Sequence, residues 1–93
     1  MTFDWDEVKA AANAAKHGVT FEEAQTVFAD PLAGIAPDPE HSAGEQREII
    51  AGLSSVGRLL LVSFTERRGS IRIISARNLT PSEQKLYEEE RYP

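Results

Sequence analysis

The strongest constraint on the fold of this chain is a pair of segments, residues 58–67 and 70–78, that are rich in aliphatic and β-branched residues. They are separated by Arg68-Gly69, and glycine is typical of tight hairpin turns because it has no side chain to disfavour a positive φ. This turn places Arg67 opposite Ser70. The two segments therefore predict an antiparallel β-hairpin.

Side chains on a strand alternate between the two faces of a sheet, so this hairpin has an apolar face and a polar face. We expect the apolar face to join the core, and it contains Leu60, Val62, Phe64, Ile71 and Ile73. We expect the polar face to meet solvent, and it contains Ser63, Thr65, Arg67 and Arg72. The arginines of the polar face either pair with Glu66 or with glutamates of the last helix, or bind a ligand.

Arg77 lies at the far end of the second strand, where strict alternation puts it on the apolar side. A guanidinium there must pair with a buried carboxylate or turn outward at the sheet edge, since an unpaired buried charge is too costly. Arg47, near the start of the strand expected at residues 46–53, has the same ambiguity. The directions of these two arginines are therefore open.

Capping signals mark the second and third of three expected helices. Thr20 and Glu23 form a capping box, and the helix that they open ends before residues 30–31, because the residue before a proline is displaced from the α region. Thr80 and Glu83 form another capping box, with a proline at the first helical position. Both helix starts are therefore predicted from local chemistry.

The first helix follows a short strand at residues 3–5, with Asp4 or Asp6 as its N-cap and Gly18 just past its end. Residues 31–45 are rich in proline and glycine and indicate a surface loop. The element order is then β-α-α-β-β-β-α, which predicts a single α+β domain spanning residues 1–93.

Charge is unevenly distributed along the chain, whose net charge is -5. Residues 1–46 contain nine acidic residues and two lysines, whereas residues 47–77 contain six arginines and two glutamates. Guanidinium groups match phosphate oxygens, so the basic segment favours a nucleic-acid partner. The chain contains no cysteine and two histidines, so we expect neither a metal nor a cofactor. It has no signal-like or membrane-length apolar run, so we expect a cytoplasmic protein without membrane contact.

Five motifs together resemble the BrnT toxins of type II toxin-antitoxin systems. They are FDWDEVKAAANAAKHGVTFEEA at residues 3–24, DP at 30–31, HSAGEQR at 41–47, TER at 65–67 and IRIISAR at 71–77. The resemblance implies a RelE-like fold, with two N-terminal helices and one C-terminal helix packed on a small antiparallel β-sheet. It also implies a ribonuclease that stops translation by cutting RNA. Its implied partner is a BrnA-like antitoxin with a ribbon-helix-helix domain, through which the pair binds operator DNA and represses its own operon.

Cleavage of RNA without a metal needs cations that stabilise the charge developing on the phosphate. Arg67 and Arg72 are the first candidates for this role, and Arg77 and Arg47 are the second. The chain differs from the family after residue 77, because Asn78 stands where further basic residues often follow. The last helix is also acidic, so the basic surface is smaller than the resemblance implies.

The same reaction needs a base for the 2′-hydroxyl proton and an acid for the leaving 5′-oxygen. Glu66 and His41 are the candidates, although Glu66 equally suits an ion pair with the arginines and His41 a hydrogen bond within its loop. For His17 we favour a helix C-cap over contact with RNA. For Trp5 we favour a packed aromatic over a base-stacking platform, and for Tyr87 a packed aromatic over a hydroxyl group for proton transfer.

Two other classes of function remain open at this point. The chain is alternatively a module that binds an antitoxin without cutting RNA, since its acidic ends suit a basic partner. A gyrase poison of the related ParE kind is the third reading, and DNA damage rather than translational arrest would then follow its expression.

Overall fold

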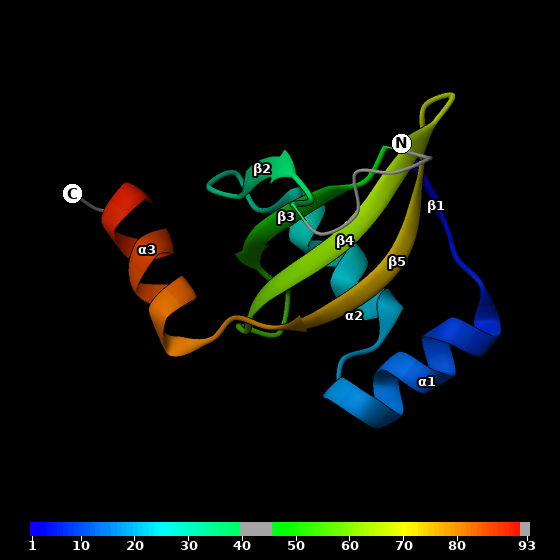
Figure 1. Cartoon of the computed structure of the whole chain (residues 1–93), viewed down its shortest axis with the longest axis horizontal. Helices are drawn as coiled ribbons and strands as arrows, with labels where there is room; N and C mark the ends of the chain where they lie inside the picture. Colours follow the sequence, from blue (N-terminus) through cyan, green and yellow to red (C-terminus); the bar gives the residue numbers. More distant parts are fainter. Residues whose placement is uncertain (40–45, 92–93) are drawn as a thin grey trace.

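The computed structural model describes residues 1–39 and 46–91 and has an α+β fold (Figure 1). The strands are β1 (Thr2–Asp4), β2 (Gly34–Pro37), β3 (Glu48–Leu53), β4 (Leu59–Arg67) and β5 (Ser70–Asn78). The helices are α1 (Glu7–His17), α2 (Phe21–Thr26), the 3₁₀ turn η1 (Val27–Ala29) and α3 (Pro81–Arg91). The strands form one sheet in the order β1-β5-β4-β3-β2, so the predicted hairpin lies within the sheet, flanked on both sides.

Helices α1 and α2 cover one face of the sheet, whereas α3 lies apart from them at the other end of the molecule (Figure 1). The core between α2 and the sheet includes every residue predicted for the apolar face of the hairpin. Its largest fully buried side chains are Val19, Phe21, Val27, Leu60, Val62 and Ile73. The opposite face of the sheet, which we call the open face, is therefore the one available for ligands.

The sheet is mixed, so the expectation of an antiparallel sheet is wrong at one edge. β1 runs parallel to β5, and Phe3 lies opposite Ile71. Phe3 packs edge-on against Phe28, with ring centroids 5.2 Å apart. Burial of this aromatic contact stabilises the N-terminal strand in its position beside β5.

Residues 34–37 form β2 and not the surface loop that was expected. β2 pairs with β3 from Gly34 opposite Ala51 to Pro37 opposite Glu48. An edge strand tolerates proline, because a residue there need not donate to a neighbouring strand on both sides. The rest of the expected loop includes residues 40–45, which lie outside the described part of the chain.

A β-bulge in β5 changes the direction of Arg77. The hairpin register is as predicted near its turn, but Phe64 faces Ile73 while Ser63 faces Ser75, which leaves Ile74 as the extra residue. An extra residue reverses the alternation of side chains beyond it. Ala76 is consequently buried in the core, and Arg77 lies on the open face, opposite Leu61. The prediction that Arg77 has the parity of the core is therefore wrong.

Local capping rules are confirmed at all three helix starts. Asp6, and not Asp4, caps α1 by accepting from the backbone N–H groups of Val8 and Lys9, and these bonds lower the pKa of its carboxyl. Thr20 accepts from the N–H of Glu23 at the start of α2. The capping box of α3 is reciprocal, since Thr80 and Glu83 each bond the other's backbone N–H.

Candidate functional site

A polar hollow of about 490 Å³ lies where the open face meets the end of α1 and the start of α3. Its charged and hydroxyl-bearing lining residues are Lys16, His17, Asp38, Ser63, Ser75, Arg77 and Glu83. Lys16 and His17 come from the last turn of α1, Asp38 directly follows β2, and the other polar groups come from strands β4 and β5 and from α3. Three basic side chains therefore converge from segments far apart in the sequence.

The buried amide of Asn13 joins α1 to β5 at this hollow. Its Nδ2 donates to the carbonyls of Val19 and Ala76, and its Oδ1 accepts from the Ala76 N–H. Asn13 lies one helical turn before Lys16 and His17, while Ala76 lies between Ser75 and Arg77. These bonds therefore set the position of both basic sides of the hollow.

A second brace holds the end of α1 from the other side. Arg58 donates through Nε to Glu23 at 3.0 Å and through Nη2 to the carbonyl of Gly18 at 3.1 Å, and its Nη2 also forms an ion pair with Glu23. The bond with Arg58 lowers the pKa of Glu23, and the same bond raises the pKa of Arg58. The left-handed turn at Gly18, whose φ is 68°, is thus fixed directly after Lys16 and His17.

Arg77 is held by the last helix. Its two terminal nitrogens donate to the two carboxylate oxygens of Glu83 at 2.7 and 3.0 Å, and Nη1 also donates to the carbonyl of Asn78. The bond with Arg77, and to a lesser degree the bond with the Thr80 N–H, lower the pKa of Glu83 to about 2. Arg77 is therefore in a defined orientation at the hollow, and its charge is partly balanced.

The other predicted cations lie elsewhere on the same sheet. Arg72 projects from β5 on the open face and forms an ion pair with Asp4 of β1 at 3.2 Å. Arg67 is exposed beside the hairpin turn, and Arg47 is half-buried just before β3. The structure therefore separates Arg67 and Arg72, near the hairpin turn, from Arg77 at the hollow. Arg72 therefore pairs with Asp4 and not with Glu66 or a glutamate of the last helix, whereas Arg77 pairs with Glu83 of that helix.

Of the candidates for proton transfer, Glu66 is not brought together with Arg67 and Arg72. Glu66 pairs with Ile71 and so has the alternation of the core side, away from Arg67 and Arg72. His41 lies outside the described residues. Tyr87 is packed, as expected, and its hydroxyl donates to Asp30 at 3.0 Å. Within residues 1–39 and 46–91, His17 is the single histidine, and it lines the polar hollow.

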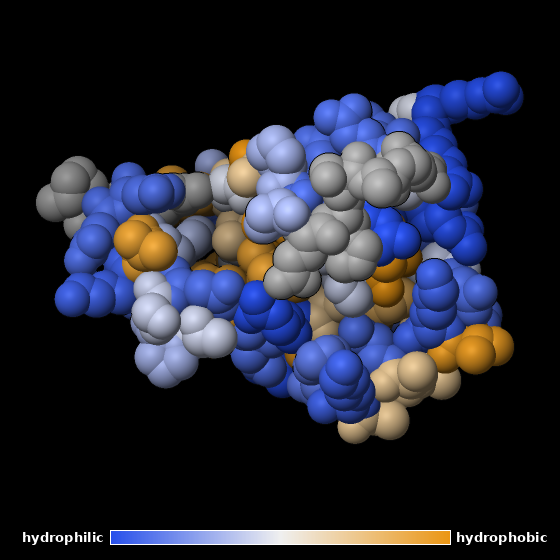
Figure 2. Space-filling model, viewed as in Figure 1, coloured by the Kyte–Doolittle hydropathy of each residue, from blue (hydrophilic) through white to orange (hydrophobic). Residues whose placement is uncertain are grey.

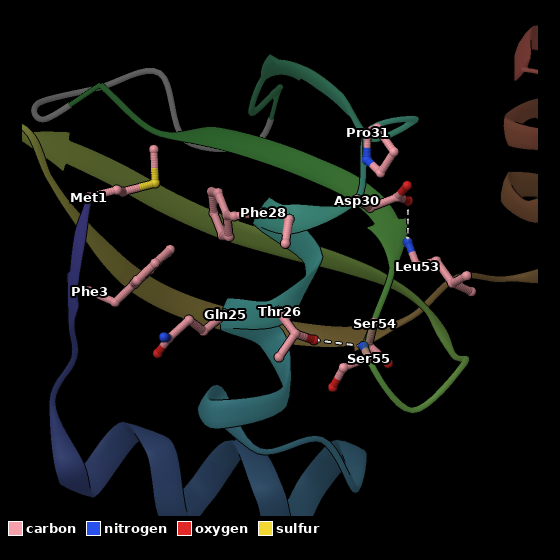
Figure 3. Close-up of a pocket in the computed structure, with 11 residues that line it drawn as sticks. Met1, Phe3, Gln25, Thr26, Phe28, Asp30, Pro31, Leu53, Ser54 and Ser55 are labelled. Carbon is pink, nitrogen blue, oxygen red and sulfur yellow. Dashed lines mark hydrogen bonds between the residues drawn. The ribbon is translucent and has the colours of Figure 1, made fainter.

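Asp30, which lies beside another hollow (Figure 3), connects the turn after η1 with β3 and α3. Its carboxylate accepts from the N–H groups of Leu32 and Leu53 and from the hydroxyl of Tyr87. Trp5, also expected to be packed, is half-buried and lies edge-on to Phe21 at 5.9 Å. These contacts organise the fold around the site and leave the polar hollow as the candidate.

The sequence interpretation missed Lys16, His17 and Ser75 as site residues. The first two were explained by helix capping, which they also satisfy, and Ser75 was missed because of the bulge. Their usable signal was the spacing of Asn13, Lys16 and His17 on one helix. Within residues 1–39 and 46–91, no three acidic or histidine side chains are grouped as metal ligands. In the same ranges, no helix is long and apolar enough to cross a bilayer.

Comparison with known proteins points to one family. The family model described as "Ribonuclease toxin, BrnT, of type II toxin-antitoxin system" matches residues 5–83. The crystal structure of the Brucella abortus ribonuclease toxin BrnT superposes with a TM-score of 0.68 and 24% sequence identity, covering 86% of this chain and 97% of that one. This structural likeness shows a shared fold. No curated protein matches the chain.

Proposed function

Because the chain belongs to the BrnT family of ribonuclease toxins of type II toxin-antitoxin systems, we propose that it cuts RNA at the polar hollow of its open face. The observation that carries this proposal is the convergence of Lys16, His17 and Arg77 on one concave surface. Such a surface offers both positive charge for a phosphate and an imidazole that can accept or donate a proton. The protein is then an endoribonuclease that acts in the cytoplasm and blocks translation.

In cleavage of RNA without a metal, the 2′-hydroxyl loses its proton and its oxygen attacks the adjacent phosphorus. The bond from phosphorus to the 5′-oxygen breaks, and the 5′-oxygen takes up a proton. His17 is suited to exchange one of these protons. Lys16 and Arg77 stabilise the negative charge that grows on the phosphate oxygens, so the residues themselves supply the positive charge and no metal is required. Ser63 and Ser75 add hydroxyl groups for hydrogen bonds to the RNA.

The arginines near the hairpin turn extend the surface along the same face. Arg67 and Arg72 are proposed to position the RNA backbone, because phosphate contacts fix the register of a nucleic acid. Arg47, which directly precedes β3, remains a further candidate for contact with the RNA backbone, and His41 remains a candidate for proton transfer. Glu66 lies on the core side of β4, so it can act as a base only for an RNA that extends past the hairpin turn at Arg68-Gly69.

The activity is proposed to be neutralised by a BrnA-like antitoxin with a ribbon-helix-helix domain. The complex then represses its own operon, and the chain meets operator DNA only through the antitoxin. A RelE-like relationship of the fold belongs to this proposal as well.

A binding module without RNA cleavage is the second candidate. It is favoured by one observation, that Arg72 and Arg77 each form an ion pair with a carboxylate, of Asp4 and of Glu83. Ion pairs of this kind reduce the charge available to a phosphate. Such a module would bind the antitoxin as tightly as the proposed ribonuclease does, but it would leave RNA intact.

Expression without the antitoxin tests the proposal. We expect growth and incorporation of labelled amino acids to stop, and we expect Lys16→Ala and Arg77→Ala to relieve the arrest. Arg67→Ala and Arg72→Ala should weaken it. Continued translation with soluble, folded protein would favour the binding module, and DNA damage with continued translation would indicate a gyrase poison.

A further inference from the structure

An apolar groove of about 440 Å³ runs between α3 and the open face at strands β2, β3 and β4. Its apolar lining residues are Ile35, Ala36, Ile49, Ala51, Leu61, Leu79, Leu86 and Tyr87. Ile35 is 58% exposed and Leu86 is 60% exposed, although both are large and aliphatic. Figure 2 shows hydrophobic surface in the hollow between the α3 end of the molecule and the sheet. Contiguous exposed apolar surface of this kind marks an interaction site.

The rim of this groove is acidic. The two charged side chains that line it are those of Glu83 and Glu90, within the part of the chain that the structure describes. On α3, Leu86 has Glu83 three residues before it and Glu89 and Glu90 three and four residues after it, so these glutamates are its neighbours on the helix surface. The groove therefore combines an apolar floor with negative charge at its border.

This combination selects the chemistry of the occupant. An RNA is disfavoured because its phosphates would meet the glutamates of α3. A second copy of this chain is disfavoured too, since a symmetric contact sets the same patch of both copies together and would oppose the glutamates of two α3 helices. A basic amphipathic segment fits, with apolar side chains in the groove and lysines or arginines at its rim.

The groove adjoins the polar hollow. Ile49, Leu61 and Glu83 line both, so an occupant of the groove stands at the entrance to the proposed cleavage site. Glu83 also holds Arg77, and a cation brought to the rim would compete for that carboxylate. Binding at the groove would thus change access to the hollow and the state of Arg77 together.

We propose that the groove between α3 and strands β2–β4 is the docking site of a basic amphipathic segment of the antitoxin, and that docking there blocks RNA from the hollow. This inference rests on the proposed function, because it names the site at which the partner of that function acts. The edge strand β2 contributes side chains to this docking and not a backbone ladder, since it is short and ends in Pro37.

The test uses the full chain and a purified BrnA-like antitoxin with a ribbon-helix-helix domain, with affinity measured by calorimetry. Leu86→Lys and Ala36→Lys place a repelling charge in the groove, and each should weaken binding by about tenfold or more, as for anchor residues of interfaces. Val8→Lys is the matched control, because Val8 is 79% exposed on α1, away from the groove. It should leave the affinity unchanged.

Circular dichroism and thermal unfolding of each variant establish that the fold is kept. Unchanged affinity of both folded groove variants would overturn the docking site. The double variant Glu89→Lys and Glu90→Lys should also weaken binding and flatten its salt dependence, and unchanged binding would overturn the basic partner.

RNA cleavage is measured in parallel without antitoxin, so that the two proposals fail separately. Leu86→Lys should cut RNA like the wild type and resist inhibition by the antitoxin. Cleavage by the wild type without any binding of the antitoxin would overturn the docking site alone. Tight binding without cleavage would overturn the proposed ribonuclease and keep the docking site.

Discussion

Asn13 and Ala76, 63 residues apart, are joined by two hydrogen bonds, since Nδ2 donates to the Ala76 carbonyl at 2.8 Å and Oδ1 accepts from its N–H at 3.0 Å. Asn13→Asp removes the donor and sets a carboxylate oxygen against two carbonyls. We expect a loss of about 2 to 4 kcal/mol in the free energy of unfolding, because buried polar groups then lack partners. Urea unfolding measures this loss. The exposed Asn78→Asp is the control, and equal losses for the two variants would contradict the account.

Gly52 is required by the close approach of β3 to the Asp30 region. A Cβ atom at Gly52 would lie 2.9 Å from the Cβ of Ala33 and 3.0 Å from both Asp30 Oδ2 and Val27 Cγ1. Gly52→Ala is therefore expected to cost about 1 to 3 kcal/mol of stability through overpacking. Thermal unfolding checks the value, with the exposed Val56→Ala as control. Wild-type stability of Gly52→Ala would contradict this prediction, because it would show that the neighbouring atoms of Ala33, Asp30 and Val27 move aside at little cost.

The Arg77–Glu83 pair predicts a pH dependence of stability. The pKa of Glu83 is about 2 in the folded protein, below its ordinary value of 4.5, so the ionised form stabilises the fold at any pH above that ordinary value. This contribution is lost as the pH falls from 4.5 toward 2. Glu83→Gln should be destabilised by about 1 kcal/mol at pH 7, a modest value because solvent screens the partly exposed pair.

Urea titrations of the wild type and Glu83→Gln at pH 7, 4 and 2.5 measure this dependence. The difference between them should narrow toward pH 2.5, while the exposed Glu89→Gln should show no such trend. A constant difference at all three values would mean that the ionised carboxylate contributes little.

Local chemistry made much of the fold predictable. The capping boxes at Thr20 and Thr80 and the turn at Arg68-Gly69 depend on neighbouring residues only, and the structure confirms all three. Both turn residues have positive φ, 52° at Arg68 and 81° at Gly69, as a type I′ turn requires.

The remaining features of the fold and of the site depend on pairing between distant strands, so they could not be predicted from local sequence. The bulge at Ile74 has no local signal, because the run Ile73-Ile74-Ser75 is compatible with either alternation. Pairing with β3 made a strand of residues 34–37, where composition indicated a loop. The candidate hollow depends on both effects and on the bonds of Asn13, so only Arg77 of its basic residues was among the candidates from sequence.

Cleavage of a labelled RNA by the purified protein, without antitoxin and with EDTA present, tests the central claim most directly. We predict that the wild type cuts the RNA and that His17→Ala and Arg77→Ala each reduce the rate of cleavage about 100-fold. Lys85→Ala, a substitution at an exposed position of α3, should cut at the wild-type rate. All variants should unfold cooperatively, which shows that the fold is kept. Intact RNA with the wild type, or wild-type rates for both His17→Ala and Arg77→Ala, would contradict cleavage at the polar hollow.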